Sequence, residues 1–185
     1  MDLDVIALIV AGLSLCVSFV GTILSNRRSK DALALAQRAA IDARWSALQE
    51  AVQRLIGFDP TADPIEERLI NLRIAMVALV DELPDWDGLD TWLDAERALG
   101  ATFGRQVMTA ARPGDDVEQR VRNLEPLMTW AQALSSNLRF LRSKGYVPKT
   151  LQQLTDHVTA LIREVHEKNG WDLPPSVNPR IGKLE

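Results

Sequence analysis

The chain begins with a long apolar run. Residues 5–24 (VIALIVAGLSLCVSFVGTIL) are 20 residues without a charged residue or a proline. At a rise of about 1.5 Å per residue, a helix of this length crosses the hydrocarbon layer of a bilayer, which is roughly 30 Å thick. A core helix of a soluble protein seldom continues so far without a charge. We therefore expect a single transmembrane helix over residues 5–25.

The residues on either side of this run predict its orientation. Residues 1–4 carry two aspartates and no base, whereas Arg27, Arg28 and Lys30 follow the run directly. Because basic residues stay on the cytoplasmic side, we expect a short external N-terminus and a cytoplasmic remainder. A cleaved signal peptide is the competing interpretation, but it needs a basic start and a small-residue cleavage pattern. Arginine outnumbers lysine 16 to 5, which is typical of a GC-rich bacterial gene, so the expected location is the cell inner membrane.

Small side chains recur along one face of the expected membrane helix. They follow a 4, 3, 4, 3 spacing, the period of a left-handed helix pair: Ala7, Ala11, Ser14, Ser18 and Gly21. Small residues let two helix backbones approach closely in lipid. This stripe predicts a homo-oligomer or a partner helix; the alternative is chance, because membrane helices are rich in such residues.

After residue 25 the apolar positions follow a helical period. Residues 26–40 are mostly alanine and polar residues, which predicts a juxtamembrane helical stalk. Apolar rows separated by Pro and Gly breaks then predict further helices across a bundle of residues 41–170. Nothing alternates like a strand. The predicted fold class is all-α: a single transmembrane helix continuing into a cytoplasmic antiparallel bundle of about four or five helices. Residues 171–185 form a Pro-rich tail, either disordered or packed on the bundle through Trp171.

Local signals predict how the helices begin and pack. A second helix starts at Asp63-Pro64, and its two apolar rows suggest the most buried helix of the bundle. Asp87 or Asp90 would cap the third helix, and Asp115 or Asp116 the fourth. Within the fourth helix Pro126 either kinks the chain or follows a new cap at Asn123.

Composition excludes several classes of function. The net charge of −4 argues against nucleic acid as a partner, and one cysteine excludes a disulfide framework or a Cys-based zinc site. His157 and His166 lie on opposite sides of one predicted helix and are expected at the surface or its rim, so no metal is predicted. The alternative is a site that joins His157 to carboxylates of other helices. No nucleophile-elbow, P-loop or dinucleotide-binding motif occurs, and no cofactor is expected. Glu96, near the apolar side of the third helix, is expected to be half-buried and paired with an arginine; the alternative is a functional carboxyl with a raised pKa.

The segment 81–96 is the strongest charge anomaly, with seven acids and no base. Its spacing does not fit a calcium-binding EF-hand loop. Helix capping explains part of the acidity, and the alternative is a partner-binding surface of Asp85, Trp86, Asp87 and Asp90, because aromatic anchors are enriched at interfaces.

A second charged group surrounds the predicted turn at residues 143–148. Helix order places this turn at the end of the bundle where the acidic segment also lies, near the membrane. Its basic residues could face anionic lipid together with those after the membrane helix. The predicted lipid-facing set is Arg27, Arg28, Lys30, Arg142, Lys144 and Lys149; the alternative is an ordinary solvated helix end.

Together these patterns predict a non-enzymatic, membrane-anchored scaffold that recruits an unknown cytoplasmic protein or its own copies. One alternative is a membrane-associated effector, of prophage or defence type, that perturbs the bilayer or a host complex. The other is an enzyme with a carboxylate site inside the bundle.

Overall fold

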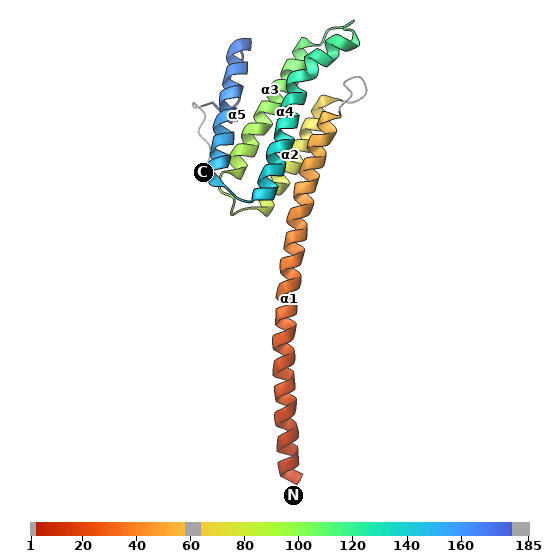
Figure 1. The fold of residues 1–185 in the computed structure, drawn as a ribbon, viewed down its shortest axis with the longest axis vertical. Coiled ribbons are helices and arrows are strands. Elements are labelled where there is room, and N and C mark those ends of the chain that lie inside the picture. The colour runs from red at the N-terminus through yellow and green to blue at the C-terminus, as the bar shows by residue number, and fades with distance from the viewer. Residues whose placement is uncertain (1–2, 58–63, 179–185) are drawn as a thin grey trace. The chain divides into compact units, whose positions relative to one another are not determined.

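A computed structural model describes residues 3–57 and 64–178, with side chains from residue 29 onward. It contains α1 (Leu3–Ile56), α2 (Ile65–Glu82), α3 (Leu89–Ala110), α4 (Val117–Lys144) and α5 (Pro148–Asn169) (Figure 1). No strand occurs in these two ranges, so the prediction of an all-α helical bundle is confirmed. The chain forms two units, residues 1–42 and 43–185, and the bundle is the second.

Where side chains are described, no helix combines the length and the apolar character that crossing a membrane requires. The predicted span at residues 5–25 and its small-residue stripe lie outside those side chains, which begin at residue 29. The same holds for Arg27 and Arg28.

The centre of the bundle is α3, which contacts α2, α4 and α5 (Figure 1). Leu89, Trp92, Leu93 and Leu99 on this helix are at most 2% exposed. The prediction that the second helix is the most buried was wrong. One of its apolar rows faces the core, but the other remains exposed, because α3 and not α2 has neighbours on several sides.

The last turns of α1 belong to the bundle and pack as the sequence predicts. Trp45, Leu48, Val52 and Leu55, spaced 3, 4, 3, are all buried. Their burial removes apolar surface from water, which is the main favourable term in folding. A hydrogen bond of 3.0 Å from Gln53 Nε2 to Ser135 Oγ also joins α1 to α4.

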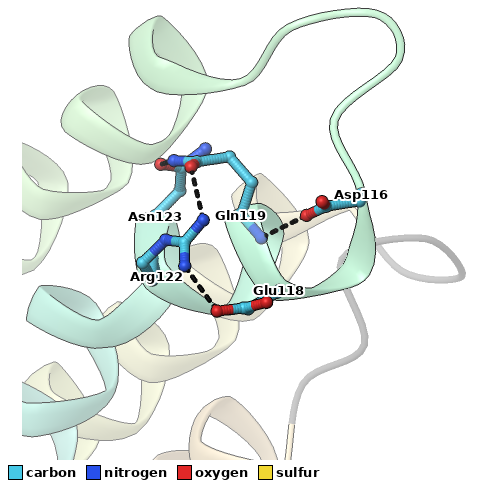
Figure 2. Close-up of polar contacts among 5 residues, drawn as sticks. All are labelled: Asp116, Glu118, Gln119, Arg122 and Asn123. Carbon is cyan, nitrogen blue, oxygen red and sulfur yellow. Dashed lines mark hydrogen bonds and ion pairs between the residues drawn. The ribbon is translucent and has the colours of Figure 1, made fainter.

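One helix, α4, continues through Pro126 without interruption. Asp116 caps it, since its carboxylate accepts a hydrogen bond of 2.7 Å from the backbone N–H of Gln119 (Figure 2). The alternative cap at Asn123 was wrong: this residue lies inside the helix, and its Oδ1 accepts from the Gln119 side chain at 2.8 Å (Figure 2). Proline is tolerated here with the loss of one backbone hydrogen bond.

Glycine residues cap the start of α3 and the end of α5. Gly88, with φ of +84°, is the N-cap of α3, so the predicted capping by Asp87 or Asp90 was wrong. At the end of α5, Gly170 adopts φ of +65°, the left-handed conformation that is common at helix C-termini. Glycine occupies this backbone region at little cost.

Candidate functional site

The carboxyl group of Glu96 lies inside the bundle between two tryptophans. The side chain projects from α3, and the residue is 2% exposed. Trp92, one turn earlier, donates its indole N–H to Oε1 at 3.0 Å. Trp130 on α4 donates its indole N–H to Oε2 at 2.7 Å. Each carboxyl oxygen therefore has one indole donor.

Burial dominates the electrostatics of this group. Loss of hydration raises the pKa of the Glu96 carboxyl from 4.5 to about 7, although the indole N–H groups of Trp130 and Trp92 oppose the shift. The expectation of a half-buried Glu96 paired with arginine was wrong, because the helix period cannot reveal that Trp130 approaches from α4. The nearest arginine in sequence, Arg97, instead pairs with Asp94 at 2.7 Å on the partly exposed side of α3.

The close approach of Trp130 to α3 depends on a glycine. A Cβ added to Gly100 would lie 2.9 Å from Cζ2 of the Trp130 ring, closer than real Cβ atoms come to such neighbours. The ring thus occupies the space that any larger residue at position 100 would fill. The absence of a side chain at Gly100 therefore permits the close packing of α4 against α3.

A groove of about 620 Å³ opens beside Glu96 between α3, α4 and α5. Its walls are mainly apolar and include Leu99, Phe103, Leu134, Leu154, Leu161 and the ring of Trp130. Its polar lining residues are Glu96, Glu125, Thr129, Asn137 and His157. A concave apolar surface of this size with a few polar groups is typical of small-molecule sites.

The groove therefore combines an apolar enclosure with a carboxyl that changes its protonation near neutral pH. Such a group can accept a hydrogen bond or a proton from a bound molecule. Within the described ranges, no cluster of three or more His, Cys, Asp or Glu side chains has a geometry suited to a metal ion.

His166 lies at a second buried polar position, at the end of α5. Its Nδ1 donates to the backbone carbonyl of Asp172 at 2.6 Å, and its Nε2 lies 3.0 Å from the Thr102 hydroxyl on α3. The ring also packs edge-on against Trp171 at 5.7 Å, and Arg105 stacks over Trp171 at 4.2 Å. The expectation of a surface His166 was wrong, because the tail covers it. The alternative of a tail packed through Trp171 holds for residues 171–178.

Trp86, the centre of the predicted partner surface, is half-buried in an aromatic row. Its ring lies 5.8 Å from that of Trp45 on α1 and 5.7 Å from that of Tyr146 in the α4–α5 turn. Tyr146 donates its hydroxyl to the Asp87 carbonyl at 3.1 Å, so the acidic turn and the basic turn lie at the same end of the bundle, as predicted. Asp85, Asp87 and Asp90 are exposed around this row.

The described members of the predicted lipid-facing set are exposed, but Arg142 also makes contacts within the bundle. Lys144 and Lys149 are exposed at the α4–α5 turn, and Lys30 is exposed on α1. Arg142 donates to Ser46 Oγ at 3.4 Å and to Gln49 Oε1 at 3.3 Å. This arginine therefore helps to hold α4 against α1.

Sequence reasoning missed the roles of Trp92, Trp130 and Thr102 as hydrogen-bond partners of buried groups. Trp92 had a signal in the sequence, since it precedes Glu96 by four residues and shares its helix face. No local signal could show that Trp130 and Thr102 meet Glu96 and His166, because these contacts join different helices.

Comparison of the chain with protein-family models, curated proteins and solved structures gives no match. The function is therefore argued from the residues and their geometry.

Proposed function

We propose that the protein is a membrane-anchored, non-enzymatic interaction module that binds a cytoplasmic partner through the outer face of α2. The observation that carries this proposal is an exposed apolar row on that helix. Ile70, Ile74 and Val77 are 50%, 62% and 52% exposed, and their spacing of 4 and 3 places them on one face. Contiguous exposed apolar surface is typical of protein interaction sites.

A groove beside this row supports a helical occupant. It lies between α1 and α2, has a volume of about 320 Å³, and is lined by small side chains together with Ile74. The small residues are Ala47, Ala51, Ala75 and Ala78. Shallow grooves of this kind accept the apolar side chains of an amphipathic helix.

The charges at the edge of the groove suggest the character of the partner. Arg44, Arg54 and Arg68 line it together with one acid, Glu50, which forms an ion pair with Arg54. Arg44 also contacts Glu82 at 3.4 Å, a weak contact between partly exposed groups. We therefore propose that the partner presents an acidic amphipathic helix, because complementary charge favours association and specificity.

The anchor in this proposal is the apolar run at residues 5–24, with the N-terminus outside the inner membrane. Its support is the length and hydropathy of the run and the basic residues that follow it. The small-residue stripe that contains Ala7 and Gly21 would allow the anchors of two copies to associate.

Crosslinking in intact native membranes tests the proposal. The full-length protein is compared with Ile74→Glu, which places a charge on the apolar row, and with Glu164→Gln, a change at an exposed position on α5. We expect one distinct protein to crosslink to the wild type and to Glu164→Gln, and its loss in Ile74→Glu. A partner that Ile74→Glu retains, or crosslinks between copies alone, would contradict docking on α2.

A further inference from the structure

The groove beside Glu96 has an unbalanced set of charges. Among its lining residues, Glu96 on α3 and Glu125 on α4 are acids, while His157 on α5 is the one basic type and no lysine or arginine contributes. A positively charged ligand group would therefore meet complementary charge in an apolar enclosure, where an ion pair is strengthened by the low dielectric.

The hydrogen bonds of Glu96 leave room for such a group. A carboxylate has about four lone-pair positions, and the two indole N–H donors of Trp92 and Trp130 use one on each oxygen. Glu96 is only 2% exposed, but it belongs to the lining of the groove, so the groove is the side from which a donor would reach the remaining positions. A protonated amine supplies up to three N–H donors together with the charge that balances the carboxylate.

The apolar lining of the groove indicates the chemistry of the rest of the ligand. Leu99, Leu154 and Leu161 offer aliphatic contacts, and the rings of Phe103 and Trp130 offer flat apolar faces. An aromatic face close to the carboxylate also attracts a cation through its quadrupole. The volume of about 620 Å³ is within the usual range for drug-sized molecules.

We propose that the groove between α3, α4 and α5 binds an organic cation, a protonated amine on an apolar body, whose ammonium group pairs with Glu96. The site is independent of the α2 face, since the two share no lining residue. It adds a small-molecule ligand to a protein whose proposed partner is another protein.

Three probes of one shape test this site. 1-Naphthylmethylamine, 1-naphthalenemethanol and 1-naphthylacetate carry the same ring system with a cationic, a neutral and an anionic group. Binding is measured by titration calorimetry on the full-length protein in lipid nanodiscs, with empty nanodiscs as the blank. We expect the amine to bind roughly tenfold more tightly than the alcohol, and the anion to bind least, because one charge pair in a partly dry site provides about this much.

Two variants identify the group that is responsible. Glu96→Gln should lower amine affinity to the level of the alcohol and leave alcohol affinity unchanged. Asp94→Asn, on the same helix but outside the groove, should leave the preference intact. Retention of the preference in Glu96→Gln, or equal affinity of the amine and the alcohol for the wild type, would overturn the proposal.

A third variant keeps the test valid if Glu96→Gln does not fold. Leu161→Trp places a larger side chain into the groove and retains the carboxyl. It should weaken the amine and the alcohol together by roughly tenfold, because both need the same apolar volume. Unchanged binding of both probes in Leu161→Trp would place them elsewhere and contradict the assignment.

Discussion

The ring of Trp130 lies against the backbone of Gly100, and this contact places its indole N–H 2.7 Å from Oε2 of Glu96. The absence of a side chain on α3 thus permits a hydrogen bond to a buried acid one turn away on the same helix. Every buried side-chain polar atom in the described part of the chain has a hydrogen-bond partner, so Glu96 and His166 are accommodated rather than left unsatisfied.

Replacing Gly100 should displace Trp130. Gly100→Ala is expected to lower the free energy of unfolding by about 1–3 kcal/mol, because the new Cβ would overlap a rigid ring that also holds Glu96. Chemical denaturation followed by circular dichroism measures this change. Gly104→Ala is the matched control, since its Cβ would meet the flexible end of Leu69 at 2.9 Å. That variant should be neutral or gain up to about 1 kcal/mol from helix propensity; equal losses in both variants would contradict the role of the Trp130 contact.

The buried acid predicts a pH dependence of stability. The pKa of Glu96 is about 7 in the folded protein and 4.5 is its ordinary value, so the folded state binds this proton more tightly. Its contribution is fully present below pH 4.5 and is lost as the pH rises through 7, amounting to about 3 kcal/mol. Denaturation at several pH values should show this decline in the wild type and a flatter profile in Glu96→Gln. Parallel profiles in the two proteins would contradict the assignment of this pH dependence to Glu96.

His166 is expected to hold the segment after α5. His166→Ala removes the donor to the Asp172 carbonyl and the edge contact with Trp171, which should release residues 171–178. The cost is about 1–3 kcal/mol, because buried polar groups lose their partner. Hydrogen exchange measured by mass spectrometry should show faster exchange in this segment, and His157→Ala, at an exposed position, should show none. Unchanged protection of residues 171–178 in His166→Ala would refute this role.

Trp86 is expected to contribute to the stability of the fold, independently of any partner. Trp86→Ala removes a ring that lies between Trp45 and Tyr146, and it should lower the free energy of unfolding by about 2 kcal/mol. Asp85→Ala, at the exposed neighbouring position, should change it by no more than about 0.5 kcal/mol. Thermal denaturation of both variants checks this, and a fully stable Trp86→Ala protein would show that the aromatic row contributes little.

Much of the fold could be predicted because it depends on short-range patterns. The row of Trp45, Leu48, Val52 and Leu55 has helical spacing, and all four are buried. The cap at Asp116 depends on a residue type with a strong local preference, and it is confirmed. The predicted cap of α3 was wrong. Gly88 itself occupies the N-cap position in a left-handed conformation, and no aspartate side chain caps the helix.

The candidate site was harder to predict because its contacts join distant residues. Glu96 and Trp130 are 34 positions apart in sequence. The helix period places each residue on a face of its own helix, but it cannot predict a hydrogen bond between the two helices. The two apolar rows of α2 were interpreted as deep burial, whereas one of them is an exposed face. A row of this kind has the same sequence pattern whether a core or a partner covers it.

A photo-crosslinking scan along α2 tests the central claim most directly, namely that the outer face of this helix is the docking surface of an anchored module. A photoreactive amino acid is placed at single positions of the full-length protein in native membranes. The account predicts adducts with one partner at Ile70, Ile74 and Val77, and none from exposed positions on α5 such as Glu164. Adducts spread evenly over both helices, or none from the three apolar positions, would contradict it.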